Sequence, residues 1–181
     1  MRFDHYHIRP LTEADLHSYF EMAERNRKRL EDFFTGTVSR TKTLEDTKNF
    51  LADITKRAAA KTYMPFIIVD ETSAKPIGFL DLKNIDWSIP KSEVGCYMDE
   101  GYAGKGVATK AFKIFCDHCF REFGFAKLFL RTHESNIAAK KLAETAGFEV
   151  EGIIRSDYKT TSGQLVDLIY YGRLSPASLS G

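Results

Sequence analysis

The segment from Glu93 to Ala111 constrains the fold most, because a strand-forming run leads through a glycine-rich loop into a helix-forming run. Gly104 and Gly106 remove side chains where the backbone can approach a ligand closely. The first N–H groups of the following helix have no partner within the helix, and the helix dipole places partial positive charge at the same end. The sequence therefore predicts an anion cradle that suits a phosphate or pyrophosphate group.

Two well-known phosphate loops fit these residues poorly. The Walker A loop needs Ser or Thr directly after Gly-Lys to hold magnesium, whereas Gly106 follows Lys105 here. The dinucleotide-binding fingerprint needs a third spaced glycine after a first strand, but Thr109 stands at that place and the loop lies past the middle of the chain. A glycine-rich turn can also serve tight packing alone, so the downstream sequence has to decide between packing and binding.

The residues after the loop predict two helices, a strand and a hairpin. Apolar residues recur at steps of three and four along a long helix that ends at Gly124, and a second helix ends at Gly147. Two runs rich in β-forming residues are separated by the turn 160–163 and favour a terminal hairpin. The expected ranges are 108–123 and 136–146 for the helices, 127–132 for the strand, and 148–158 and 164–171 for the hairpin.

The N-terminal part predicts helices followed by two strands. Thr43 offers a hydroxyl cap, and acidic residues follow it in the first helical turn. No long linker, repeat or low-complexity tract divides the chain, so we expect one α+β domain over residues 1–174 and a flexible tail over 175–181. The helical ranges are 11–26, a stretch containing 30–34, and 43–60; the strands are 63–70 and 77–87.

Composition is that of an ordinary globular domain. A chain of 181 residues buries roughly 70% of its unfolded surface, enough for a core without disulfides or a structural metal. Its 26 basic and 25 acidic residues argue against direct binding of nucleic acid, which favours a basic excess. We find no apolar run of membrane-spanning length, and residues 1–7 lack a signal-peptide core, so we expect no membrane partner and a cytoplasmic location.

The Cys-x-x-Cys run formed by Cys116 and Cys119 raises the alternatives of a redox pair or a zinc site. Both cysteines lie within the apolar stripe and well inside the predicted helix, whereas a low-pKa redox pair usually lies at a helix start. A zinc site needs further ligands nearby. We therefore expect both thiols to pack in the core, and we expect no metal site.

Five features in the same order resemble the GNAT acetyltransferases, and within them the ribosomal-protein N-terminal acetyltransferase group. The specific similarity runs from about Ile77 to Leu174, and the residues 8–16 resemble the family's usual first strand and helix. The features are the pyrophosphate loop Gly104–Thr109, Asn136 after a strand, Ala146-Gly147-Phe148, the run Glu151–Arg155, and Asp167 in the last strand.

This resemblance implies a single domain with a mixed, mostly antiparallel sheet of about six to seven strands flanked by helices. It implies acetyl-CoA as co-substrate and direct transfer of the acetyl group to a primary amine. The strand over 95–99 would splay from its neighbour, and an N–H at Met98 or Tyr97 would bind the thioester oxygen. The implied cofactor-binding residues are Tyr97, Met98, Ala103, Gly104, Lys105, Gly106, Val107, Ala108, Thr109 and Asn136.

Glu93 and Glu151 are the candidate catalytic bases that would take the ammonium proton through water. An apolar setting would raise a glutamate pKa toward working pH, as this chemistry requires. The alternative is that Glu93 is a solvated residue at a strand start and that Glu151 is a structural partner of Arg155.

The sequence departs from the family at the proton donor. Relatives often carry a serine three residues after the asparagine or a tyrosine seven after it, but Ala139 and Ala143 stand at these places and neither can donate. Tyr97, Tyr170, His133 or water could protonate the departing sulfur, or it could leave as a thiolate.

The acceptor is the least constrained part. Phe33, Phe34 and Trp87 could wall its cleft or pack in the core, and Asp167 or Glu100 could pair with a cation. The resemblance implies the N-terminus of a ribosomal protein, with antibiotics or polyamines as alternatives.

Two further classes remain open. The missing serine and tyrosine are compatible with a non-catalytic acetyl-CoA-binding sensor, and the loop alone with a flavin- or nucleotide-binding protein. Two copies could associate as a homodimer through an exposed sheet edge or the terminal hairpin.

Overall fold

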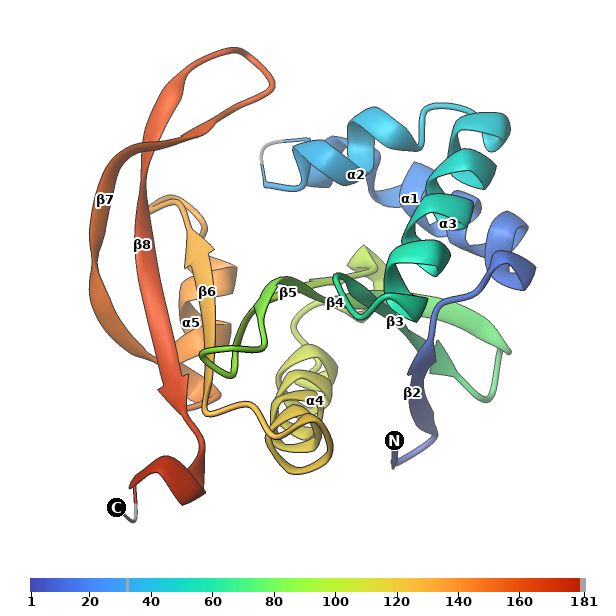
Figure 1. The fold of residues 1–181 in the computed structure, drawn as a ribbon. Helices are drawn as coiled ribbons and strands as arrows, with labels where there is room; N and C mark the ends of the chain where they lie inside the picture. Colours follow the sequence, from blue (N-terminus) through green and yellow to red (C-terminus); the bar gives the residue numbers. More distant parts are fainter. Residues whose placement is uncertain (32, 180–181) are drawn as a thin grey trace.

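One eight-stranded sheet organises the computed structural model, which describes residues 1–31 and 33–179 (Figure 1). The strand order is β1-β2-β3-β4-β5-β6-β8-β7, and every neighbouring pair is antiparallel except β5 with β6. This confirms the α+β fold with a mostly antiparallel sheet. The strand count exceeds the expected six to seven, and the short β1 at the edge was not predicted.

The strands are β1 (Arg2–Phe3), β2 (Tyr6–Pro10), β3 (Met64–Asp70), β4 (Lys75–Asp86), β5 (Lys91–Met98), β6 (Lys127–Thr132), β7 (Glu149–Lys159) and β8 (Leu165–Leu174). The helices are α1 (Leu16–Leu30), α2 (Thr35–Arg40), α3 (Leu44–Ala59), α4 (Val107–Phe123) and α5 (Ile137–Thr145). Short 3₁₀ turns occupy Glu13–Asp15, Glu100–Tyr102 and Pro176–Leu179. Most predicted elements are present, but the helical stretch expected around 30–34 is wrong, because α1 ends at Leu30 and Glu31 and Phe33 lie in a turn. The short helix α2 follows this turn, at residues that the sequence did not indicate as helical.

Helices cover both faces of the sheet, so the central strands are buried on both sides. In β3, Phe66 and Ile68 join the cluster that packs against α4, whereas Ile67 and Val69 join the cluster under α1 and α3. Successive side chains of a strand point to opposite faces, which explains why β3 is a continuous apolar run. Figure 1 shows α1, α2 and α3 on one side of the strands and α4 on the other.

Glycines and caps set the ends of the helices as the sequence predicts. Gly106 and Gly124, at the two ends of α4, have φ values of 77° and 70°, and Gly147 after α5 has 82°. These left-handed conformations favour glycine because it has no Cβ. The side chain of Thr43 accepts a hydrogen bond from the N–H of Asp46 at 3.1 Å, which caps α3 as predicted.

Cys116 and Cys119, the two cysteines of the Cys-x-x-Cys run, lie on the inner face of α4 and are fully buried in the core cluster. The prediction of core packing is confirmed. Burial raises the pKa of both thiols above the ordinary value, which disfavours the reactive thiolate.

Two further expectations concern the flexible tail over 175–181 and membrane-spanning segments. Ser175, expected to begin a flexible tail, is buried, and its N–H donates to the carbonyl oxygen of Ala126 at 2.9 Å. The last two residues of the expected tail lie outside the described part of the chain. Within the described residues, none of the helices is both long and apolar enough to cross a bilayer.

The substitution Thr43→Ala is expected to lower the free energy of unfolding by about 1 kcal/mol, because it removes the hydroxyl that caps α3. Denaturant unfolding followed by circular dichroism measures this change. Thr145→Ala, at the exposed end of α5, is the control and should change the free energy of unfolding by less than about 0.5 kcal/mol. Equal stability of Thr43→Ala and the unmodified chain would contradict the assignment of this cap.

Candidate active site

The separation of β5 from β6 creates the main cleft of the protein. The two strands pair only at Lys91–Glu93 with Lys127–Phe129, and no further β5–β6 pair occurs among the described residues. Beyond this point a cleft of about 300 Å³ opens, lined by both strands, the start of α5 and the tip of the β7–β8 hairpin. The splay predicted for residues 95–99 is therefore confirmed.

The register of β5 on β4 fixes which backbone groups face the cleft. The N–H of Asp99 donates to the carbonyl of Ile77 on the β4 side at 2.7 Å, and Tyr97 lies opposite Phe79. In an antiparallel pair the backbone groups of alternate residues point to the same neighbour. The N–H of Tyr97 therefore points to β4, and that of Met98 points to the open side. Of the two candidate donors, Met98 is the one whose N–H points to the open side, but Met98 itself does not line the cleft. Cys96, two residues earlier, has the same N–H orientation and does line it.

The Tyr97 side chain lies on the other side, under α1 and α3. Its ring centroid is 5.2 Å from that of Phe34 and 5.3 Å from that of Phe79, and its hydroxyl is 3.3 Å from that of Tyr19. Burial raises the pKa of the Tyr97 hydroxyl well above its ordinary value. Because this hydroxyl does not line the cleft, it is poorly placed to protonate a departing sulfur.

The glycine loop has the open backbone that an anion cradle needs. Gly104 and Gly106 have φ values of 73° and 77°, and a Cβ added at either would meet no atom within 4 Å in the described part of the chain. Gly106 leads directly into α4, whose first N–H groups have no earlier helical carbonyl to bond. Lys105 donates from Nζ to the carbonyl of Gly101 at 2.7 Å, which fixes the turn. These residues fit a pyrophosphate group.

Asp99 anchors this loop to α1. Its carboxylate accepts bonds from Arg25 Nε at 3.1 Å and Nη2 at 2.8 Å, and from the N–H of Gly101 at 3.1 Å. Burial alone would raise the pKa of Asp99, but the bonds from Arg25 and Gly101 outweigh burial and lower it. The loop is thereby held next to the open edge of β5.

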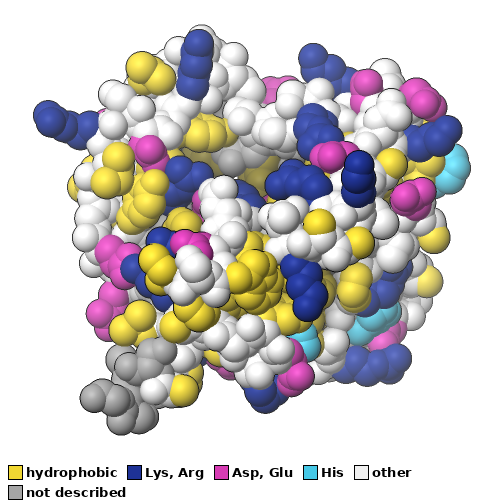
Figure 2. All heavy atoms as spheres, in the orientation of Figure 1, with side chains coloured by type: hydrophobic (Ala, Val, Ile, Leu, Met, Phe, Trp, Pro, Cys, Tyr) yellow, Lys and Arg dark blue, Asp and Glu magenta, His cyan; other side chains and the backbone are white. Residues whose placement is uncertain are grey.

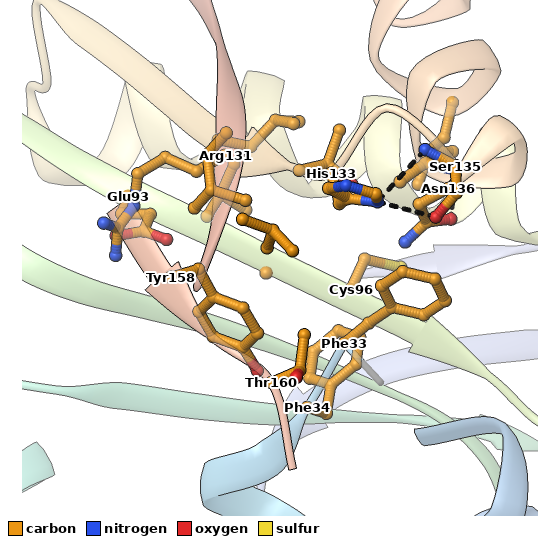
Figure 3. Close-up of a pocket in the computed structure, with 18 of the residues that line it drawn as sticks. Phe33, Phe34, Glu93, Cys96, Arg131, His133, Ser135, Asn136, Tyr158 and Thr160 are labelled. Atoms are coloured by element: carbon orange, nitrogen blue, oxygen red, sulfur yellow. Dashed lines mark hydrogen bonds and ion pairs between the residues drawn. The ribbon is translucent and has the colours of Figure 1, made fainter. Parts of the chain in front are cut away.

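Asn136 lies in the cleft at the start of α5 (Figure 3). Its Oδ1 accepts from the N–H of Ala139 at 3.1 Å as the helix cap, which leaves Nδ2 to donate to a ligand. His133 and Ser135 line the cleft beside it, with Nδ1 of the histidine 2.7 Å from the serine hydroxyl. The Ser135 N–H donates to the same Nδ1, so the ring proton is on Nε2. The sequence pattern did not single out Ser135.

The comparisons with known proteins agree with this arrangement. A GNAT acetyltransferase domain matches residues 6–149, which is most of the chain. The chain belongs to the GNAT acetyltransferase family. It is therefore an acetyltransferase that uses acetyl-CoA, and the glycine loop, the open edge of β5 and Asn136 are the residues that fit this co-substrate.

Curated relatives of this GNAT acetyltransferase include two proteins of Bacillus subtilis (strain 168). The probable N-acetyltransferase YjcK is 24% identical over 154 residues, covering 84% of this chain and 85% of YjcK. The putative ribosomal N-acetyltransferase YdaF is 26% identical over 178 residues, covering 94% and 92%. Spermidine N(1)-acetyltransferase of Escherichia coli (strain K12) is 29% identical over 90 residues, about half of each chain.

Solved structures share the same fold. Ribosomal-protein-S5-alanine acetyltransferase from Vibrio fischeri has a TM-score of 0.86 at 22% identity, covering 97% of this chain and 96% of its own. RimL, a ribosomal L7/L12 alpha-N-protein acetyltransferase solved with coenzyme A, has a TM-score of 0.87 at 16% identity and covers 97% of each chain.

Glu93 is the candidate base that the structure places in the cleft, but its oxygens are already engaged. It is 4% exposed and accepts from Asn84 Nδ2 at 2.6 Å and Arg131 Nη2 at 3.0 Å, with Lys83 Nζ at 3.5 Å. Burial alone would lower the pKa of Arg131, yet its bonds to Glu93 raise it above the ordinary value. The group is an ion-pair centre at the closed end of the cleft rather than a solvated strand start.

Glu151 lies outside the cleft. Its carboxylate forms an ion pair with Lys127 at 2.6 Å, where β6 begins and the sheet is still closed. Its partner is thus Lys127 rather than Arg155, the alternative drawn from the sequence. The structure brings only one of the two candidate bases to the acetyl-transfer cleft.

Of the residues expected to bind the acceptor, some line the cleft and others lie elsewhere. Phe33 and Phe34 line the cleft, whereas Trp87 stacks on Phe125 at a centroid distance of 5.1 Å and donates to the carbonyl of Lys61. Asp167 does not line the cleft, and its Oδ1 accepts from the N–H of Ser156 at 2.9 Å.

Glu100, a candidate cation partner, and Tyr170, a candidate proton donor, both lie outside the cleft. Glu100 donates from its N–H to Asn26, at the loop before the cradle, and does not line the cleft. Tyr170 donates to Asp157 at 2.8 Å and does not line the cleft either.

The hairpin tip supplies cleft residues that the sequence did not predict. Tyr158, Thr160, Ser162 and Gln164 line the cleft opposite the phenylalanines. The Tyr158 hydroxyl donates to Thr35 Oγ1 at 2.9 Å and so joins the hairpin to α2 across the cleft. The two residues are separated by 123 positions, so no local pattern could have indicated this contact.

Gly106→Val is expected to weaken acetyl-CoA binding by at least about tenfold, because a branched side chain would enter the space in front of the α4 N–H groups. Gly124→Val is the matched control, since this glycine has a similar φ at the opposite end of α4. Both changes should cost about 1–2 kcal/mol of stability from backbone strain. Calorimetric titration with acetyl-CoA separates them, and equal affinity losses would argue against the cradle.

Proposed function

We propose that this GNAT acetyltransferase transfers the acetyl group of acetyl-CoA to the N-terminal amine of a protein. The observation that carries this proposal is the form of the acceptor side of the cleft, where aromatic and hydrogen-bonding side chains face each other. Phe33, Phe34 and Tyr158 suit the side chain of a terminal residue, and Thr160 and Gln164 can bond the backbone amides that follow it. Similarity to a putative ribosomal N-acetyltransferase along 94% of the chain supports the same acceptor.

The co-substrate supplies an acetyl group activated as a thioester. In the proposed arrangement the N–H groups of the loop from Gly104 onward bind its pyrophosphate. The Cys96 N–H, which points to the open side of β5 as that of Met98 does, donates to the carbonyl oxygen of the thioester and stabilises the charge that grows there during attack. Asn136 Nδ2 donates from the opposite wall, since the Oδ1 of this residue is used by the helix cap.

His133, held by Ser135, takes the place of the missing family serine and tyrosine in this proposal. The Nε2–H of His133 is a donor at the same wall as Asn136, and the hydroxyl and N–H of Ser135 hold the ring through Nδ1 (Figure 3). A donor there can stabilise the departing thiolate by a hydrogen bond, which Ala139 and Ala143 cannot do, and water then supplies the proton.

A polyamine is the second candidate acceptor, because a spermidine acetyltransferase matches half of the chain. The charges of the cleft favour it less. Lys83 and Arg131 line the cleft and already balance the carboxylates of Glu93 and Asp157, so these residues leave no surplus of negative charge for the several positive charges of a polyamine. A peptide N-terminus brings a single ammonium group and uncharged amides.

Thiol release from acetyl-CoA should rise with N-terminal peptides and stay near background with spermidine, aminoglycosides and the same peptides already N-acetylated. The blocked peptides are the matched control, because they differ from the substrates only at the amine. Thiol release with spermidine or an aminoglycoside, but not with any peptide, would show that the acceptor is a small amine rather than a protein N-terminus. Calorimetric binding of acetyl-CoA without release from any amine would instead support a non-catalytic sensor.

A further inference from the structure

A second cavity of about 230 Å³ adjoins the cleft on the α1 and α3 side of the sheet. The two cavities share the lining residues Phe33, Phe34, Lys83 and Tyr158. Figure 2 shows this side of the molecule hollowed between the hairpin and the α2 region, with apolar side chains at the base of the hollow and Lys and Arg side chains around it. We call the second cavity the acceptor chamber.

Asp81 of β4 is the unusual group in the acceptor chamber. Its side chain lines the chamber, and the residue is only 5% exposed. Oδ2 accepts from the Tyr63 hydroxyl at 2.7 Å, but Oδ1 is buried without a hydrogen-bond partner among the described residues. A buried carboxylate oxygen without a partner is costly, so its retention points to a role with a ligand.

Asp81 is also next to the point where the acetyl group must arrive. Asp81 pairs with Gly95 across the β4–β5 ladder, and a Cβ at Gly95 would collide with Oδ1. Gly95 itself lines the main cleft, on the stretch of β5 that has left β6. A co-substrate that follows the open edge of β5 from Met98 toward Glu93 passes Gly95, with Asp81 on the chamber side of the strand.

The surrounding ion pairs set Asp81 apart from the neighbouring carboxylates. Glu93 and Asp157 are paired with Lys83 and Arg131, whereas Asp81 has no ion pair among the described residues. With Arg57, which lines the same chamber and has no carboxylate partner among the described residues, the three carboxylates and three cations balance. Burial alone would lower the pKa of Lys83, but Asp81 and Glu93 raise it, so Lys83 stays charged and takes part in this balance.

Two arginines also line the acceptor chamber, and both have partners. Arg40 pairs with Asp53 at 2.9 Å, and the guanidinium of Arg57 lies 4.7 Å from the centroid of the Tyr63 ring. A guanidinium can donate only, so these groups suit carbonyl oxygens of the acceptor rather than its amine.

We propose that Asp81 and Tyr63 form the binding site for the ammonium group of the acceptor, a single primary amine whose first residue is a compact, largely apolar body. Tyr63 donates its proton to Asp81, so its oxygen can accept an N–H from the ammonium group, and the carboxylate balances the charge. Phe50, Ile54 and Phe34 enclose the apolar body. This inference rests on the proposed function only in taking an amine as acceptor, and it assigns a positioning role to both residues.

Alaninamide is the probe for this site, and lactamide is its uncharged counterpart with a hydroxyl in place of the ammonium group. NMR titration of the coenzyme A complex should show binding of alaninamide and at least about tenfold weaker binding of lactamide. Asp81→Asn and Tyr63→Phe should each weaken alaninamide binding by about tenfold or more, while calorimetry shows unchanged affinity for acetyl-CoA. Asp86→Asn, on the same strand but outside both cavities, should retain the affinity of the unmodified chain for alaninamide.

Kinetics with any amine that is turned over should show a raised KM for that amine in Asp81→Asn, with a smaller change in kcat. Tyr63→Phe keeps the ring and removes only the hydroxyl, so it remains informative if Asp81→Asn unfolds. Equal binding of alaninamide and lactamide, no binding of alaninamide, or unchanged affinity in Tyr63→Phe and Asp81→Asn would overturn the site. The binding titration gives this answer even if no peptide is acetylated, so it is separate from the test of the proposed function.

Discussion

The early end of the β5–β6 pairing is the constraint on which the rest of the site depends. Only three residues of each strand pair, and Arg131 of β6 reaches back to Glu93, the last paired residue of β5, at 3.0 Å. Glu93 is almost out of water, so leaving its charge unpaired would be costly, whereas the Arg131 side chain stays 27% exposed. The pair lies at the point of separation, and the open side of β5 and the cleft begin there.

Local signals explain why so much of the cofactor side could be predicted from the sequence. Gly106, Gly124 and Gly147 adopt positive φ where the helices were expected to begin or end, and Thr43 and Asn136 cap helices with their own side chains. Each signal acts within a few residues, so one sequence suffices to find it. The pyrophosphate loop and the family resemblance depend on the same short-range features.

The acceptor side depends on contacts between distant segments, and here the sequence was less informative. Glu151 lies where the β7–β8 register shifts, so strand alternation could not say which way it points, and it pairs with Lys127. Trp87 is aromatic and lies between Lys83 and Glu93 in the sequence, both of which line the cleft, yet its side chain packs on Phe125. Asp81 has no motif around it. Asp81 stands out because it is buried and because its Oδ1 has no hydrogen-bond partner among the described residues. Both properties arise only when β3, β4 and β5 lie side by side.

The two cavities give a physical reason for a glycine at position 95. The proposed path of the thioester runs along one edge of β5, and the proposed ammonium site lies on the chamber side of the same strand. A side chain at Gly95 would collide with Asp81 and thicken the wall between them. Glu93, two residues earlier on the same face, forms ion pairs with Lys83 and Arg131, so its carboxylate is not free to bind the acceptor. The carboxylate left to recognise a cation is therefore the one opposite the glycine, where the two reacting groups can come together.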